Sequence, residues 1–127
     1  MAKEISISID VPDLQVAEIF YISALGCSKV RDQGKTMVVL SAGNADIYLI
    51  QRAAGSNAIP AGTADVARSY ERHWTPVHLD FGVDDVAAAV SRIEAAGGTR
   101  ESGEEGDWGA IAHCVDPFGN GFCVIRE

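Results

Sequence analysis

Two short stretches of the sequence hold the side chains best suited to chemistry. "VHLDFGVDDV" places His78 and Asp80 two residues apart, and "DPFGNGFCV" places Cys123 near the carboxyl end of the chain. An imidazole, a carboxylate and a thiol can hold a metal ion, transfer a proton or act as a nucleophile. Each also has an ordinary structural alternative. For Cys123 this alternative is a small buried hydrophobic side chain that fills space.

The stretch that contains His78 is half of an internal repeat. Residues 6–14, "SISIDVPDL", match residues 78–86, "HLDFGVDDV", at a constant offset of 72, and the match continues without a gap through Gly26 and Gly98. Strict alternation predicts a half-buried strand at the start of each half, and apolar residues three or four apart then predict a helix. Asp13 and Asp85 are positioned to cap the starts of these helices, and the two glycines to end them.

Two hairpins complete the repeat. Gly43-Asn44 separates "TMVVLSA" from "ADIYLIQ", and "DPFGN" separates "WGAIAHCV" from "GFCVIRE". With a shorter strand before each hairpin, near residues 27–31 and 99–101, each half reads βαβββ. The sequence therefore predicts an α+β fold in one domain, with module one (4–52), a connector (53–75) and module two (76–127). The acidic run "ESGEEGD" is predicted to be a solvated loop, with an acidic binding patch as the alternative.

Composition limits the classes of function. The chain has 127 residues, 47% of them apolar and 22% charged, as in ordinary soluble globular domains. A net charge of −8 argues against nucleic acid as a partner, because binding it requires Lys and Arg. We expect no membrane association and a cytoplasmic location, since there is no long apolar run, no signal-like N-terminus and no disulfide pattern among the three cysteines.

Three longer segments resemble one known group of proteins. "VPDLQVAEIFYISALG", "HLDFGVDDVAAAVSRIEAAGG" and "DWGAIAHCVDPFGNGFCVI", taken with the duplicated βαβββ pattern, resemble the vicinal oxygen chelate superfamily. This superfamily includes glyoxalase I, bleomycin resistance proteins and extradiol dioxygenases. The resemblance implies two modules that curl around one cleft, and it implies a homodimer.

The resemblance also implies where a metal would bind. Family metal enzymes use a His or Gln that opens each module's first strand and a Glu on each last strand, and the matching positions here are Ser6, Tyr48, His78 and Cys123. Two residues remain possible for the position assigned to Tyr48, because aligning the two Gly-Asn turns directly gives Ile47 instead. Asp80 shares a face with His78 and could add a carboxylate. Because catalytic zinc and iron sites use about three good ligands, we predict a cleft without a metal; any metal would use His78 and Cys123.

The remaining predictions concern the lining of the cleft. His78 is predicted to bind a ligand or act as a general base, with a structural role as the alternative. Tyr48 is predicted to donate its hydroxyl, with core packing as the alternative. Trp74 and Trp108 either stack on a ligand or cover the core or a dimer contact. The predicted catalytic residues are His78 and Tyr48, and the predicted ligand-binding residues are Ser6, Ser8, Tyr48, Trp74, Asp80, Trp108 and Cys123.

Two functions of different classes follow from these residues. In the first, the protein binds a small organic molecule in a metal-free cleft without a cofactor, in the manner of bleomycin resistance proteins. In the second, it is a glyoxalase-like lyase or isomerase or a dioxygenase. This enzyme uses either a divalent metal on an unusual set that includes His78 and Cys123, or His78 as base with Tyr48 as acid. A cleft without function in a protein that serves assembly is the third possibility. The sequence contains no nucleotide-binding motif.

Overall fold

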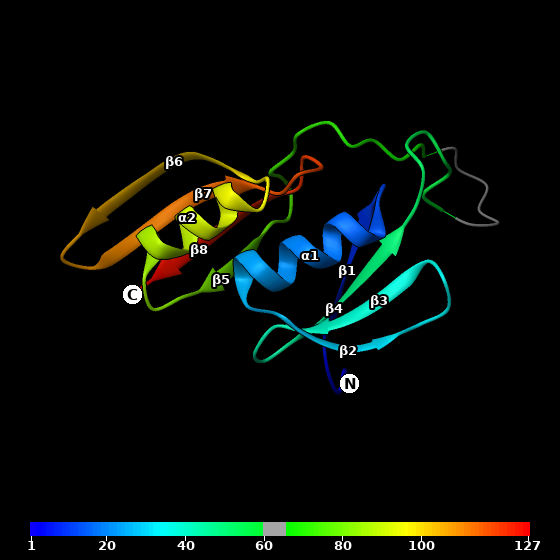
Figure 1. Cartoon of the computed structure of the whole chain (residues 1–127), viewed down its shortest axis with the longest axis horizontal. Helices are drawn as coiled ribbons and strands as arrows, with labels where there is room; N and C mark the ends of the chain where they lie inside the picture. The colour runs from blue at the N-terminus through cyan, green and yellow to red at the C-terminus, as the bar shows by residue number, and fades with distance from the viewer. Residues whose placement is uncertain (60–65) are drawn as a thin grey trace.

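The computed structural model describes residues 1–59 and 66–127, and it contains two four-stranded sheets and two helices (Figure 1). Module one contains β1 (Ser6–Val11), α1 (Leu14–Leu25), β2 (Ser28–Asp32), β3 (Met37–Ser41) and β4 (Asp46–Gln51). Module two contains β5 (Leu79–Gly82), α2 (Val86–Ala95), β6 (Thr99–Gly106), β7 (Gly109–Val115) and β8 (Gly121–Arg126). The predicted α+β fold with two βαβββ modules is confirmed.

The two sheets have the same topology. Their strand orders are β1-β4-β3-β2 and β5-β8-β7-β6, so the first strand of each module lies at one edge of its sheet. In each sheet this first strand runs parallel to the last strand, and the other neighbours are antiparallel. The internal repeat of the sequence is therefore a repeat of connectivity.

Both helices begin as predicted, and α1 also ends as predicted, whereas α2 does not. Asp13 and Asp85 each accept a hydrogen bond from the backbone N–H three residues later, at 3.2 and 3.0 Å. Gly26 ends α1 in the left-handed conformation, with φ 70°. The prediction that Gly98 ends α2 is wrong, because Ala96 is the cap. Gly98 is instead a contact position, where an added Cβ would lie 2.7 Å from Ile93 Cγ2.

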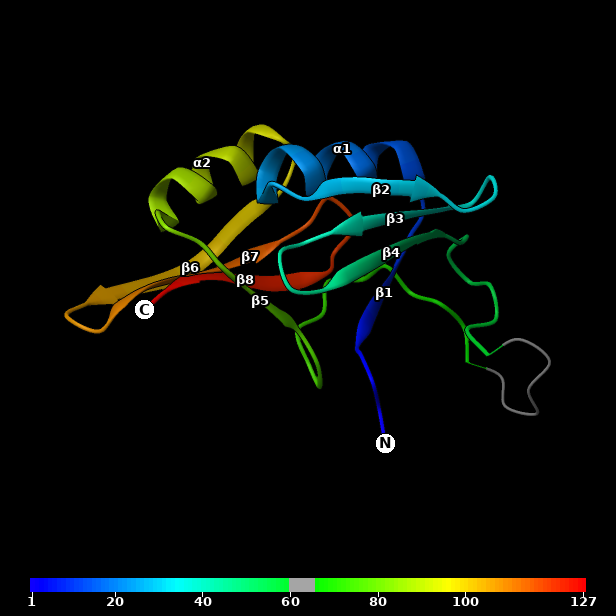
Figure 2. The ribbon, with the colours of Figure 1, turned by 90° about the horizontal axis from the view of Figure 1, so that it is seen from below.

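The hydrophobic core lies between the helices and one face of each sheet. Figure 2 shows α1 and α2 side by side on the same side of both sheets. Leu79, Phe122 and Val124 belong to this core from module two. Because side chains alternate along a strand, their neighbours in sequence point to the opposite face, which we call the open face. Tyr21 and Asp116 join the two modules within the core through a buried hydrogen bond of 2.7 Å.

One predicted loop is a strand. The acidic run 101–107 was expected to be solvated and irregular, but residues Thr99–Gly106 form β6 and pair with β7. The side chains of this run are largely exposed, as the prediction required. The loop prediction is wrong because strand pairing depends on the partner strand, and exposed charged side chains at a sheet edge do not prevent it.

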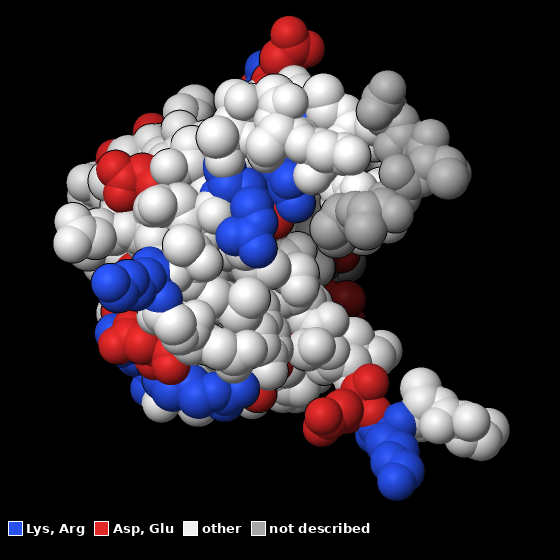
Figure 3. All heavy atoms as spheres, turned by 90° about the vertical axis from the view of Figure 1, so that its right-hand side faces the viewer, with Lys and Arg blue, Asp and Glu red and all other residues white. Residues whose placement is uncertain are grey.

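No helix among the described residues is long and apolar enough to span a membrane. On the face in Figure 3, the basic side chains form small separate groups with acidic side chains between them. Among the residues that the structure describes, the basic side chains of this face therefore form separate groups and not one continuous surface.

Candidate functional site

A hollow of about 590 Å³ opens where the edge strands of the two sheets approach each other. We call it the seam hollow, because it takes residues from β1, from β5 and the start of β8, and from the connector. Its apolar wall contains Ile7, Ile9, Val77, Leu79, Phe81 and Phe122, and its polar groups include Ser8, Asp10, Arg68, His73, His78 and Asn120. A mainly apolar wall with a few convergent polar groups is typical of sites for small organic molecules, and the volume lies within their usual range.

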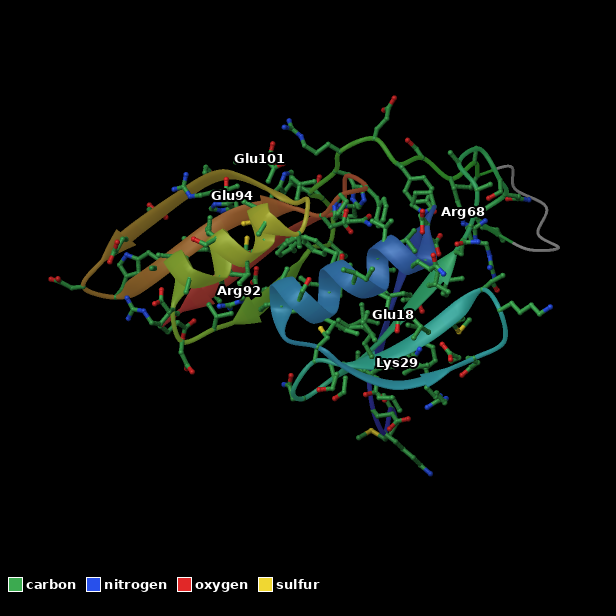
Figure 4. All side chains as sticks on the ribbon, viewed as in Figure 1. Glu18, Lys29, Arg68, Arg92, Glu94 and Glu101 are labelled. Carbon is green, nitrogen blue, oxygen red and sulfur yellow. The ribbon has the colours of Figure 1, made fainter. Side chains whose placement is uncertain are left out.

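The connector closes one side of the seam hollow through Arg68. Its Nε lies 2.7 Å from Asp10 Oδ2 on β1, and its Nη1 donates to the Asn57 carbonyl oxygen at 2.6 Å. Figure 4 shows Arg68 between the connector and the end of β1. Arg68 therefore holds the connector against module one, and its charge is balanced by Asp10.

The "DPFGN" turn places Asn120 and His73 together on the wall of the seam hollow. Asp116 accepts hydrogen bonds from the backbone N–H groups of Phe118 and Asn120 and from the Asn120 side chain. The Asn120 side chain also lies 2.8 Å from His73 Nε2, and the backbones of His73 and Asn120 pair as an isolated bridge. A turn that sequence reasoning treated as structural therefore also fixes a histidine at the cleft.

On the open face of module two, the structure brings His78, Asp80 and Cys123 together. Asp80 and Cys123 are direct partners in the parallel pairing of β5 and β8. His78 Nε2 lies 3.3 Å from Asp80 Oδ1, and the ligand atoms of all three residues lie within 4.8 Å of one another. The imidazole and the carboxylate are exposed, whereas Cys123 is 1% exposed.

The surroundings of Cys123 keep its thiol protonated. Burial and, after it, the charge of the Asp80 carboxylate, which accepts a hydrogen bond from the thiol, raise the pKa of Cys123 to about 12. A thiol with this pKa has almost no thiolate at neutral pH, so Cys123 is not an activated nucleophile. A bound metal ion would have to displace the proton.

Two aromatic side chains extend this cluster. Trp74 packs edge-on against His78 and against His113, with ring centroids 5.6 and 5.8 Å apart. The indole N–H of Trp74 donates to Glu101 at 2.9 Å. His113 pairs directly with Cys123 across β7 and β8, and its buried Nδ1 has no partner among the described residues. Trp74 therefore covers the histidines as a fixed wall.

The matching positions of module one face a different hollow. Ser6 and Tyr48 line a hollow of about 880 Å³ beside the N-terminal residues, whereas Ser8 lines the seam hollow. Ser8 pairs with Tyr48 as Asp80 pairs with Cys123, and Ser8 and Asp80 are 72 residues apart. Tyr48 is therefore the counterpart of Cys123, and the alternative, Ile47, lies fully buried in the core.

Trp108 does not join the other predicted site residues. It lies in the turn between β6 and β7, at the far tip of that hairpin (Figure 2), and is 50% exposed. Sequence reasoning also missed Asn120 and His113 as neighbours of the site. The register of β7 against β8 would have indicated His113, but no signal in the sequence places His73 against Asn120.

Comparisons with known proteins agree with this fold. The model of the glyoxalase-like domain family matches residues 6–125, while no curated protein matches the chain. A fosfomycin resistance protein from Listeria monocytogenes has 14% identity and a TM-score of 0.74, covering 100% of this chain and 94% of that one.

Two further solved structures share the fold. A lactoylglutathione lyase from Agrobacterium tumefaciens has 20% identity and a TM-score of 0.65, with 98% and 94% of the two chains covered. A glyoxalase/bleomycin resistance protein from Albidiferax ferrireducens has 21% identity and a TM-score of 0.67, with 97% and 98% covered. At such identities the likeness shows the fold alone. With the family match across nearly its whole length, this chain belongs to the glyoxalase-like domain family of the vicinal oxygen chelate superfamily.

Proposed function

We propose that the protein binds a small organic molecule in the seam hollow without a metal ion. The observation that carries this proposal is the composition of the hollow, in which apolar side chains from both modules and polar groups from β1, the connector and module two line one space. Its volume of about 590 Å³ suits a molecule of drug size. One structural relative is a glyoxalase/bleomycin resistance protein, which is compatible with such a role.

The residues around the hollow support binding more than covalent chemistry. The Cys123 thiol is protonated and buried, and its pKa is raised to about 12. His78 and His73 remain as polar groups that can hydrogen-bond a ligand. Arg68 is already paired with Asp10, so a strongly anionic ligand would have to compete for it. A neutral, mostly apolar molecule with one or two polar groups fits this set best.

Two serines on β1 provide a matched test of the location. Ser8 lines the seam hollow, whereas Ser6, on the same strand and face, lines the other hollow. A library of small aromatic compounds would be screened by ligand-observed NMR, and the binders titrated. We expect Ser8→Tyr to weaken binding at least about tenfold by filling the hollow, and Ser6→Tyr to leave it unchanged. Equal affinities for Ser8→Tyr and the parent protein would place the binding site elsewhere.

A metal-dependent enzyme is the second candidate, and the His78–Asp80–Cys123 cluster favours it. An imidazole, a carboxylate and a thiolate would provide three ligands and leave one position open, as in catalytic zinc sites. The donor set fits a divalent ion with affinity for sulfur, provided that the Cys123 proton is released. Bound by these residues, a metal would supply a Lewis acid, and of the three only His78 also lines the seam hollow.

Metal content separates the two candidates. The protein would be purified without a chelator or an affinity tag, loaded with zinc, iron, manganese and nickel in turn, and analysed by elemental mass spectrometry. The binding proposal predicts no retained metal. About one equivalent per chain that is lost in Cys123→Ser, but kept in the module-one control Tyr48→Phe, would support the enzyme instead.

We also propose that the protein acts as a homodimer in the cytoplasm. Support for a dimer comes from the outer surface of α1, where the apolar side chains of Val16, Ile19 and Ile22 are exposed, Ile19 to 66%. Support for a reducing compartment comes from the three cysteines, all free and buried. Light scattering coupled to size-exclusion chromatography tests the dimer, and a monomer at micromolar concentration would contradict it.

A further inference from the structure

The polar end of the seam hollow is built on a chain of four hydrogen-bonded residues from both modules. Tyr21 donates to Asp116 Oδ2 at 2.7 Å, the Asn120 side chain contacts the same oxygen at 2.9 Å, and Asn120 Oδ1 lies 2.8 Å from His73 Nε2. The chain begins in the core, where Tyr21 is 2% exposed, and ends at His73, which is exposed on the wall of the hollow.

The direction of each hydrogen bond follows from the chemistry of the groups. Burial, followed by the Asp116 charge, raises the pKa of Tyr21, so its hydroxyl remains protonated and donates. Asp116 is 4% exposed and lies among donors only, which are two backbone N–H groups, the Tyr21 hydroxyl and the Asn120 amide. A carboxylate in this position accepts every bond.

This arrangement fixes the orientation of the Asn120 amide. Its Nδ2 faces two acceptors, Asp116 Oδ2 and the carbonyl oxygen of Asp10, the latter at 3.4 Å. The NH₂ group must therefore point at these oxygens, and Oδ1 must point at His73. Because Oδ1 can only accept, the proton of a neutral His73 ring is on Nε2.

We propose that His73 is a ligand-positioning residue that is held as the Nε2–H tautomer, so that its Nδ1 lone pair accepts a hydrogen bond from the bound molecule. Nδ1 has no hydrogen-bond partner among residues 1–59 and 66–127. The ligand class is therefore an apolar, preferably aromatic, molecule that carries a hydroxyl or N–H donor. This inference rests on the proposed function for the site, but the tautomer of His73 does not depend on any ligand.

The tautomer is tested directly in the ligand-free protein. Long-range proton–nitrogen correlation spectra at about pH 8 distinguish the two tautomers of a neutral imidazole. The chain has three histidines, so His78→Ala and His113→Ala are enough to assign the signals. We expect the Nε2–H form for His73 and a mixture of both tautomers in Asn120→Ala. A His73 signal of the Nδ1–H form in the parent protein would overturn the inference.

The ligand class is tested with naphthol and its methyl ether, which have the same apolar body but differ in the hydroxyl donor. We expect naphthol to bind about tenfold more tightly than the ether, and His73→Phe to abolish this preference while keeping a ring of similar size. Equal affinities of the two probes in the parent protein would overturn the inference and leave the proposed binding intact. If neither probe binds, the proposed function fails on these probes, and the tautomer experiment still decides the state of His73.

Discussion

At equivalent positions of the open face, module one carries Ser8 beside Tyr48, and module two carries Asp80 beside Cys123. The strand pairing is the same in both, so the backbone gives each pair the same relative placement. The chemistry nevertheless differs, since the first pair offers two hydroxyl groups and the second a carboxylate and a thiol. The duplicated fold therefore preserves positions, and the side chains at these positions give the two modules different chemistry.

A second difference concerns the turn before the last strand of each module. In module one this turn is a short hairpin around Gly43-Asn44, closed by backbone hydrogen bonds such as that from Ala42 N–H to the Ala45 carbonyl oxygen. In module two it is "DPFGN", whose buried Asp116 accepts a hydrogen bond from Tyr21 of module one. The second turn therefore connects the two modules through this hydrogen bond.

The largest expected effect tests this difference between the turns. Asp116→Ala leaves the Tyr21 hydroxyl and the donors of the turn without their acceptor in a buried site, so we expect a loss of about 3 kcal/mol or more in the free energy of unfolding. Asn44→Ala, in the exposed turn of module one, is the control, with an expected change within about 0.5 kcal/mol. Urea unfolding measures both. Similar values for the two variants would show that Asp116 does not hold the modules together.

A smaller effect is expected at the equivalent glycines Gly26 and Gly98. An added Cβ at Gly98 would lie 2.7 Å from Ile93 Cγ2 and 2.9 Å from the Val115 carbonyl oxygen, so we expect Gly98→Ala to lower the free energy of unfolding by about 2 kcal/mol through overpacking. Gly26 has open space around it but a φ of +70°, so Gly26→Ala meets only backbone strain of about 1 kcal/mol. Thermal unfolding of both variants tests the order. A greater loss of stability in Gly26→Ala than in Gly98→Ala would show that backbone strain costs more here than overpacking.

The smallest effect at neutral pH concerns the buried cysteines of the two modules. Burial raises the pKa of Cys27 in module one to about 11 and that of Cys123 in module two to about 12. The unfolded chain releases these protons near its ordinary thiol pKa, so the folded state holds more protons above that pH. The stabilisation is complete below about pH 9 and is lost as the pH rises toward these folded values.

Unfolding curves measured across this alkaline range provide the test. We expect the free energy of unfolding of Cys123→Ala to decrease less steeply with pH than that of the parent protein, and Cys27→Ala to show the same change to a smaller extent. The comparison uses the slope with pH, because each substitution also alters packing. Parallel curves for all three proteins would show that these thiols titrate alike in the folded and unfolded states.

The sequence was sufficient for the scaffold, because its signals are local. Alternation in "SISIDV", the helix cap at Asp13 and the hairpin at Gly43 each depend on a few neighbouring residues. The strand and the cap recur 72 residues later and a second hairpin follows at "DPFGN", which indicated the duplicated fold. The side of the strand on which His78 and Asp80 lie also follows from alternation. The strand predicted near residues 99–101 was too short for β6, because a sheet edge is stabilised by its partner strand and the acidic residues of β6 favour a loop.

The sequence alone thus determined the two βαβββ modules and the face on which the reactive side chains lie, because both depend on the period of the backbone. Only the tertiary structure decided which residues meet. Parallel pairing placed Cys123 beside Asp80, the path of the connector placed His73 against Asn120, and the approach of two sheet edges made the seam hollow. Contacts of this kind join residues that are far apart in the chain, so no local pattern of residues could specify them.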